Sequence, residues 1–237
     1  MRATMIDLFP EGFEEIERDG DVELAAFCAP NTLSERLAAL PHAEVSAVAP
    51  GWRHAWRDFF RPVRIGPLWL GPPWEMPTDG LLPVTIDPGE AFGTGTHETT
   101  RLCVELLCDE ELCRLLDVGC GSGVLSIAAR RLGFVDVVSV DHDEAAVRAT
   151  VANGRRNNME LDARRLDAAA ESLPRADLAV ANIDFATLQR LLPRLPVGRA
   201  IIAGFLVDDA LDVAGWEVAV RRQSGEWAAE VRVRTLG

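Results

Sequence analysis

The sequence predicts an α/β fold: a parallel, doubly wound sheet with an antiparallel C-terminal edge, preceded by a small α+β module. Strand and helix patterns alternate from about residue 81 onward, a glycine-rich turn joins a buried strand to a helix, and two strand-like segments end the chain. We therefore divide the chain into a small α+β module (1–50), a Trp- and Pro-rich linker (51–80) and an α/β domain (81–237).

The module contains a predicted hairpin. Residues 14–18 and 22–27 flank the turn sequence D-G-D, which is typical of two paired strands. Its other predicted elements are the end of a helix at 4–9, a helix capped by Thr32 or Ser34 that runs to Leu40, and a strand at 44–49.

The linker is rich in aromatic and rigid residues, with four tryptophans and five prolines between residues 51 and 80. We expect its aromatic side chains to pack between two domains. A surface that binds nucleic acid by stacking bases on aromatic side chains would also use Trp and Arg. The negative charge of the chain and the interrupting prolines disfavour this alternative.

The α/β domain alternates regularly between the two element types. The predicted parallel strands are 115–118, 136–141, 178–181 and 200–204, the helices are 124–132, 144–157 and 185–192, and the closing antiparallel pair is 216–222 with 227–234. Such alternation is typical of helices that cross between parallel strands.

The amino-acid composition favours some classes of binding partner, location and cofactor over others. The net charge is -13 and the 24 basic residues are all arginine, so the chain should repel nucleic acid and attract basic proteins. No segment resembles a membrane span or a signal peptide, so we expect a cytoplasmic protein without membrane contact. The five cysteines form no C-x-x-C pair and the four histidines are scattered, so we expect reduced thiols and no metal site.

The glycine loop predicts a nucleotide-like ligand. It reads Gly119-x-Gly121-x-Gly123 after a strand that ends near Asp117, and Asp141 ends the following strand, where a ribose-binding carboxylate belongs. NAD and S-adenosylmethionine both fit this outline. The spacing is not the dinucleotide G-x-G-x-x-G, and Asp117 would repel a pyrophosphate but suit the cationic amino-acid end of S-adenosylmethionine. A glycine turn without a ligand would not need the two carboxylates.

Two further segments identify a family. Residues 87–100 read D-P-G-E-A-F-G-T-G-T-H-E-T-T, and residues 177–183 read D-L-A-V-A-N-I. With the loop, they resemble the bacterial methyltransferases that modify ribosomal protein eleven of the large subunit (PrmA-like), in the same order and at similar spacing. The Trp-rich stretch from Trp52 and the late G-E-W at 225–227 resemble this family too.

The resemblance implies a class I S-adenosylmethionine-dependent methyltransferase with a Rossmann-like fold, acting on amines of a basic ribosomal protein. Ligand-contacting residues of that family correspond to Thr100, Gly119, Asp141 and Asn182. Gly121 and Asp117 belong to the loop already described, and Phe92 lies in a segment that could close over the methionine part. The hydroxyls of Thr99 and Thr100 could alternatively cap a helix.

Methyl transfer from a sulfonium requires mainly that donor and acceptor be positioned. The acceptor amine must be neutral, and desolvation near the carbonyl oxygens of Asn182 and Ile183 would lower its pKa. We therefore assign no general base. His97 is the best imidazole candidate, although a loop histidine can equally bond backbone groups.

Two departures from the family pattern stand out. Asp184 replaces the usual leucine after Asn-Ile; it could attract the substrate ammonium, but we favour a helix cap. The N-terminal module lacks the first strand and most of the first helix of the family pattern, which leaves open a different protein substrate. The sequence is also compatible with a non-catalytic S-adenosylmethionine-binding module, and less so with a nicotinamide oxidoreductase, which the loop spacing disfavours.

Overall fold

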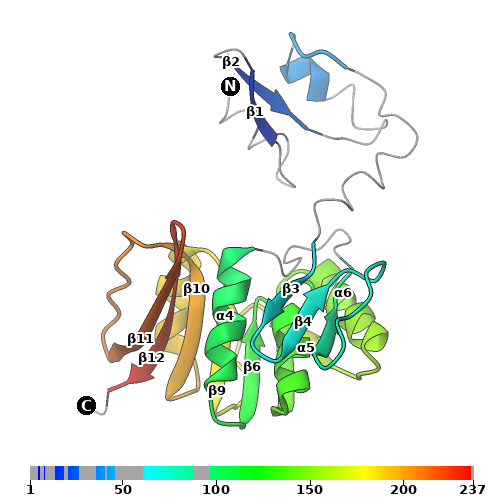
Figure 1. The fold of residues 1–237 in the computed structure, drawn as a ribbon. Coiled ribbons are helices and arrows are strands. Elements are labelled where there is room, and N and C mark those ends of the chain that lie inside the picture. Colours follow the sequence, from blue (N-terminus) through cyan, green and yellow to red (C-terminus); the bar gives the residue numbers. More distant parts are fainter. Residues whose placement is uncertain are drawn as a thin grey trace. The chain divides into compact units, whose positions relative to one another are not determined.

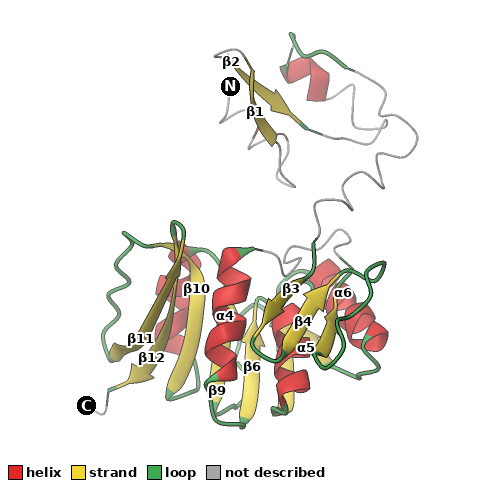
Figure 2. Ribbon diagram, in the orientation of Figure 1, coloured by secondary structure: helices red, strands yellow, loops and turns green. Residues whose placement is uncertain are grey.

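A computed structural model describes residues 5, 8, 14–18, 21–26, 36–40, 42–45, 61–87 and 97–235. The chain forms two compact units, Met1–Trp52 and Arg53–Gly237. Figures 1 and 2 show their helices and strands.

The first unit contains the predicted hairpin. Strands β1 (Glu14–Arg18) and β2 (Asp21–Ala25) pair antiparallel, which confirms this prediction. Residues 36–39 are helical, whereas Glu44 and Val45 are not in a strand. The remainder of the predicted strand at 44–49, the proposed caps Thr32 and Ser34, and most of the helix at 4–9 lie outside the described residues.

A seven-stranded sheet forms the centre of the second unit. Its strands are β6 (Arg114–Val118), β7 (Val135–Asp141), β8 (Asp162–Arg165), β9 (Leu178–Asn182), β10 (Arg199–Leu206), β11 (Trp216–Ser224) and β12 (Trp227–Arg234), in the order β11-β12-β10-β9-β6-β7-β8. Strands β8, β7, β6, β9 and β10 are parallel to one another. Strand β12 pairs antiparallel with β10, and β11 pairs antiparallel with β12. The predicted sheet with an antiparallel C-terminal edge is confirmed.

Helices cover both faces of this sheet. They are α4 (Glu98–Cys108), α5 (Val124–Leu132), α6 (Glu144–Arg156) and α7 (Phe185–Leu191), with a short 3-10 helix at Leu192–Arg194. Neighbouring residues of β6 serve two cores: Leu115 packs in the core that includes α4 and α5, and Leu116 packs in the core that includes α7. Because successive side chains of a strand point to opposite faces, and both faces of β6 are covered, Leu115 and Leu116 are both apolar.

Part of the predicted linker belongs to the second unit. Strands β3 (Val63–Ile65), β4 (Leu68–Gly71) and β5 (Leu82–Thr85) form a three-stranded sheet in that order. Its buried Leu68 and Val84 share a core with Leu102 of α4 and Ile127 of α5. Residues 61–87 therefore add an outer layer over α4 and α5, which lie beside it in Figure 1.

Buried charges fasten the C-terminal hairpin. The fully buried Glu230 of β12 accepts hydrogen bonds from Arg221 Nη1 (2.7 Å) and Arg232 Nε (2.6 Å). Arg232, only 4% exposed, also donates through Nη2 to the Leu211 carbonyl at 2.6 Å. The carboxylate and both guanidinium groups thus have partners, which burial of charge requires.

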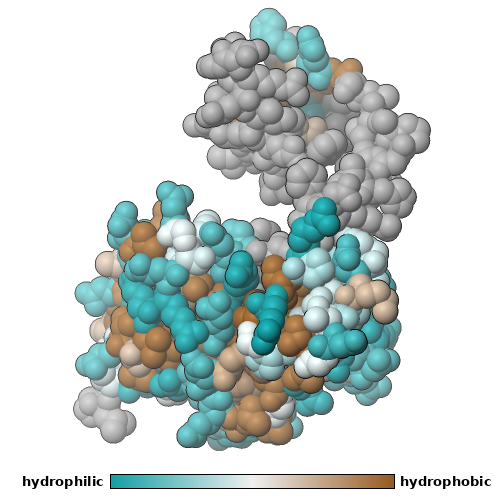
Figure 3. Space-filling view, in the orientation of Figure 1, coloured by the Kyte–Doolittle hydropathy of each residue, from teal (hydrophilic) through white to brown (hydrophobic). Residues whose placement is uncertain are grey.

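The visible surface of the second unit is mainly hydrophilic, with smaller hydrophobic areas between the polar residues (Figure 3). Exposed apolar side chains include Met76 and, on the edge strand β11, Val218 and Val220. Among the described residues, no helix has the length and apolarity needed to cross a membrane.

Candidate functional site

The C-terminal ends of the central parallel strands β9, β6 and β7 lie at one edge of the sheet. The glycine loop follows β6 here and is tied to β7, because Gly119 N and Cys120 N donate to the Val140 carbonyl at 2.9 and 3.1 Å. Gly119 and Gly121 have φ of 75° and 52°, a region in which glycine has no steric penalty. This edge is where open α/β sheets bind ligands.

Asp141 at the end of β7 is held by the loop. Its Oδ2 accepts from Gly121 N at 3.0 Å and its Oδ1 accepts from Asp143 N at 3.0 Å. The carboxylate is largely buried, with the residue 8% exposed. The structure therefore brings Gly121 and Asp141 together and fixes the orientation of the acidic group.

Asp117 lies fully buried under the start of α5. Its Oδ2 accepts from Ser126 Oγ at 2.6 Å and from Ser126 N at 3.1 Å. Its Oδ1 is buried and has no hydrogen-bond partner among the described residues. Burial, with a smaller contribution from the negative charge of Asp141, raises the pKa of Asp117 to about 7 against the opposing effect of the Ser126 hydrogen bonds.

This raised pKa predicts a pH-dependent stability. The folded state binds the Asp117 proton more tightly than the unfolded state, so this stability is present below pH 4 and is lost as pH rises to about 7. We expect Asp117→Asn to remove this loss. Between pH 5 and pH 8 the free energy of unfolding of the wild type should fall by about 2 to 3 kcal/mol relative to that of the variant. Denaturant titration at both pH values measures this difference. A difference that does not vary with pH would contradict the assignment.

Thr100 and Asn182 meet across two elements. Asn182 at the end of β9 donates through Nδ2 to Thr100 Oγ1 in the first turn of α4, at 3.2 Å. Thr100 is buried, 1% exposed, and Asn182 is partly exposed. Both were predicted site residues, 82 positions apart in sequence.

Two close approaches that the sequence did not reveal shape this edge. A Cβ at Gly119 would lie 2.5 Å from Cγ2 of Ile183, so the Ile183 side chain fills that side of the glycine loop. A Cβ at Gly204, which has φ of 102°, would lie 2.1 Å from the Ile183 carbonyl oxygen. Ile183 N also donates to the Ala203 carbonyl at 3.1 Å. Gly204 thus allows β10 to hold the turn after Asn182, and it lies where the pairing of β10 with β12 is irregular, between Ala203 and Phe205.

His97 caps α4. Its Nδ1 accepts from Thr99 N at 3.3 Å and lies 2.8 Å from Thr99 Oγ1. Its ring contacts Trp227 edge-on, with centroids 4.9 Å apart. These contacts support the backbone-bonding interpretation of His97 and place the predicted late G-E-W segment beside the start of α4.

Asp184 likewise caps a helix. Its side chain accepts from Thr187 N at 3.0 Å at the start of α7, and its hydrogen bonds to Thr187 lower its pKa. The favoured cap interpretation is confirmed, and the ammonium role stays a hypothesis.

The remaining predicted features have different outcomes. Phe92 and the rest of residues 88–96 lie outside the described residues. Within the described parts of the chain, no group of three or more His, Cys, Asp or Glu side chains could hold a metal ion. Cys103 and Cys120 are buried free thiols, and burial raises the pKa of each well above its ordinary value.

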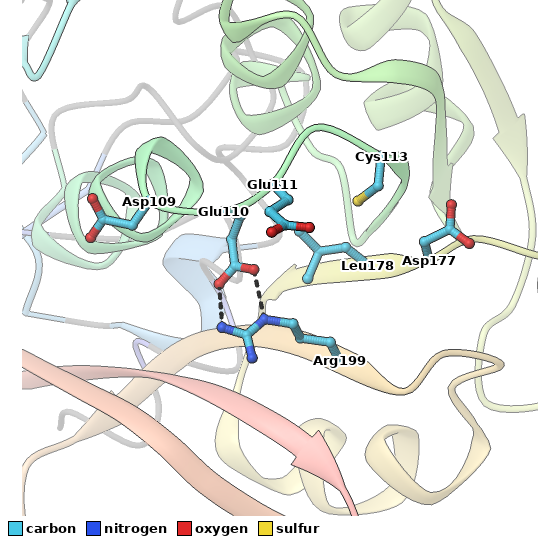
Figure 4. A pocket seen from close by; sticks show the side chains of 7 residues that line it. All are labelled: Asp109, Glu110, Glu111, Cys113, Asp177, Leu178 and Arg199. Atoms are coloured by element: carbon cyan, nitrogen blue, oxygen red, sulfur yellow. Dashed lines mark hydrogen bonds and ion pairs between the residues drawn. The ribbon is translucent and has the colours of Figure 1, made fainter.

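A hollow of about 530 Å³ lies at the opposite edge, where β6, β9 and β10 begin (Figure 4). Its lining residues are Asp109, Glu110, Glu111, Cys113, Asp177, Leu178 and Arg199. Arg199 pairs with Glu110 at 2.6 Å, and burial together with nearby carboxylates raises the pKa of the Cys113 thiol. The hollow contains none of the predicted ligand-binding residues, so we place the functional site at the glycine loop.

The chain is similar to known proteins over most of its length. The family model of "Ribosomal protein L11 methyltransferase (PrmA)" matches residues 22–235. The chain is 44% identical over 200 residues to the ribosomal protein L11 methyltransferase of Symbiobacterium thermophilum, covering 75% of this chain and 64% of that protein. It is 38% identical to the protein of the same name from Heliobacterium modesticaldum, covering 86% of this chain and 75% of that protein.

A solved structure extends the similarity to the fold. The ribosomal protein L11 methylase of Lactobacillus delbrueckii subsp. bulgaricus is similar with a TM-score of 0.66 and 26% identity, over 75% of this chain and 100% of that chain. The aligned part spans 64% of the Symbiobacterium protein and 63% of the Azotobacter vinelandii protein of the same name, slightly less than two thirds of each.

Proposed function

The chain belongs to the ribosomal protein L11 methyltransferase (PrmA) family and has the class I methyltransferase fold, and from this we propose that it methylates amino groups of a ribosomal protein with S-adenosylmethionine as donor. The amines would be lysine side chains, the N-terminal amine or both. The observation that carries the proposal is the convergence of Asp117, Gly121 and Asp141 at the ends of β6 and β7.

The residues at this edge suit the chemical groups of the donor. The fixed carboxylate of Asp141 can accept hydrogen bonds from both ribose hydroxyls. The buried Oδ1 of Asp117, which has no hydrogen-bond partner in the described part of the chain, is an acceptor suited to a cationic amino-acid end. Thr100 and Asn182 would flank that end, with Gly119 and Gly121 allowing close approach of the backbone.

The donor supplies an electrophilic methyl group on a sulfonium, and the protein's task is to hold the acceptor in line with it. We propose that the turn at Asn182 and Ile183 receives the amine and strips it of water, which favours its neutral, nucleophilic form. Asn182 donates to Thr100 through Nδ2, so its hydrogen bond to Thr100 does not occupy Oδ1, which would accept from the amine. This mechanism needs no general base, in keeping with the capping role of His97.

We further propose that the protein is cytoplasmic. We also propose that its substrate is a basic protein. The net charge of -13 favours approach of a positively charged protein. Residues 1–50 would act as the substrate-recognition module and 81–237 as the methyltransferase domain. Strands β3 and β4, within the predicted linker 51–80, would belong to that domain, because their sheet shares its core. Direct action on nucleic acid is disfavoured by the same charge.

Intact-protein mass spectrometry tests the proposal. Purified ribosomal protein L11 incubated with the enzyme and S-adenosylmethionine should gain mass in whole methyl steps, because the edge described above positions donor and amine. No gain despite measurable donor binding would rule out this substrate and favour another protein substrate or a non-catalytic binding role. Absence of donor binding would reject the methyltransferase proposal itself.

A further inference from the structure

Helix α6 packs against the rest of the second unit through a face that carries buried polar side chains. Thr150, Asn153 and Asn157 are 0%, 2% and 2% exposed, where an amphipathic helix would normally present apolar residues. Thr150 and Asn153 lie within α6, and Asn157 is its C-cap. Buried polar groups of this kind are retained with their hydrogen bonds made, so the partners of these side chains define the role of the helix.

Asn157 pairs with the free edge of β5. Its Oδ1 accepts from Thr85 N at 2.9 Å and its Nδ2 donates to the Thr85 carbonyl at 2.7 Å. One side-chain amide thus makes both hydrogen bonds that an antiparallel neighbour would make. Arg131 continues this pairing by donating through Nε to the Pro83 carbonyl at 2.7 Å.

Asn153 repeats the arrangement one helical turn earlier. Its Oδ1 accepts from Asp87 N at 3.0 Å, and its Nδ2 lies 3.5 Å from the Asp87 carbonyl. Residues four apart on a helix are separated by about 6 Å, and residues two apart on a strand by about 6.7 Å. The two asparagines therefore match Thr85 and Asp87 in spacing.

Asn153 has one contact that Asn157 lacks. Its Nδ2 donates to the carbonyl of Ser122 in the glycine loop at 2.9 Å. The neighbouring Thr150 donates to the Gly121 carbonyl at 3.0 Å. A single buried amide therefore joins the glycine loop to Asp87, which is the first residue of the D-P-G segment.

We propose that Asn153 is a positioning residue that fixes the glycine loop relative to Asp87, and thereby couples donor binding to the chain entering residues 88–96. Asn157 anchors Thr85 at the end of β5, two residues before Asp87, and none of its hydrogen bonds goes to the glycine loop. The effect of Asn153 on donor binding rests on the proposed function. The link that Asn153 makes between the glycine loop and Asp87 is present in the protein without a ligand.

The matched pair Asn153→Ala and Asn157→Ala tests this role. Each variant removes one buried amide that bonds the same chain segment, so we expect comparable losses of melting temperature. S-adenosylhomocysteine, the demethylated donor, is the probe in isothermal calorimetry. Asn153→Ala should weaken its binding about tenfold, the scale of one buried hydrogen bond, whereas Asn157→Ala should change it less than twofold.

Hydrogen–deuterium exchange of the ligand-free proteins provides a readout independent of the donor. Asn153→Ala should speed exchange of the loop amides at 119–123 about tenfold, whereas Asn157→Ala should speed exchange of Thr85 and leave the loop unchanged. If Asn153→Ala does not fold, Asn153→Asp keeps the acceptor for Asp87 N but replaces the amide donor to Ser122.

The outcomes separate the two proposals. Equal effects of both alanine variants on loop exchange would overturn the positioning role of Asn153, whatever the donor affinity. Wild-type protein that does not bind S-adenosylhomocysteine would reject the proposed function, while loop exchange would still decide the coupling. Loss of both affinity and loop protection in Asn153→Ala alone would establish it.

Discussion

Replacement of Asp141 by alanine is expected to weaken binding of S-adenosylmethionine at least about a hundredfold and to abolish methyl transfer. The change removes the proposed acceptor of two ribose hydrogen bonds, each worth about 1.5–3 kcal/mol to a charged group. It also releases Gly121 N, which the Asp141 carboxylate holds at 3.0 Å. Calorimetric titration with the donor and mass spectrometry of the acceptor protein measure the two effects.

Asp143→Ala is the matched control for this experiment. Asp143 lies two residues on and caps α6 through its side chain, which accepts from Ala145 N at 2.8 Å. Its bond to Asp141 uses the backbone N–H, which alanine keeps. The control should lose about 1 kcal/mol of stability with donor affinity unchanged. Donor binding that persists in Asp141→Ala would show that Asp141 is not the ribose acceptor.

Replacement of Gly204 by alanine should have the largest effect on the fold of the site. Its Cβ would lie 2.1 Å from the Ile183 carbonyl oxygen, at a φ of 102° that side chains rarely adopt. Relief requires movement of β10 or of the turn that follows Asn182. We expect a loss of about 3 kcal/mol or more in unfolding free energy, measured by denaturant titration, and at least tenfold slower methyl transfer.

Gly198→Ala provides the comparison, since this glycine directly precedes β10 and a Cβ there would meet nothing within 4 Å. Its stability should stay within about 0.5 kcal/mol of the wild type. If Gly204→Ala matched this control in stability and activity, the turn at Ile183 would not depend on the close approach of β10.

The central sheet could be predicted from the sequence because burial leaves a strong pattern. The buried part of β6 is apolar on both faces apart from Asp117, and α5 lies between Gly123 and Gly133, as expected from the glycines. β8 was missed because it is an edge strand with mainly charged, exposed side chains. β3 to β5 were missed because they are short and lie among prolines and tryptophans, which suggested a linker.

The site was predictable where backbone geometry and charge coincide in sequence, as at Gly121 and Asp141. Thr100 and Asn182 were predicted as site residues only from family resemblance, because no local pattern relates α4 to β9, and their hydrogen bond to each other is seen only in the structure. The roles of Asn153 and Gly204 needed coordinates: a buried asparagine on a helix looks like an exposed one in sequence, and a glycine within a strand does not reveal which carbonyl approaches it.

The buried pairing of Glu230 with Arg221 and Arg232 bears on behaviour in concentrated salt. Dissolved ions screen exposed pairs strongly and buried pairs little. Arg222 joins β11 to Asp109 beyond the end of α4 through an exposed contact, whereas Glu230 is inaccessible to solvent. High ionic strength therefore weakens the contact between β11 and the end of α4 but leaves the hairpin itself joined, so the antiparallel edge keeps its internal structure in concentrated salt.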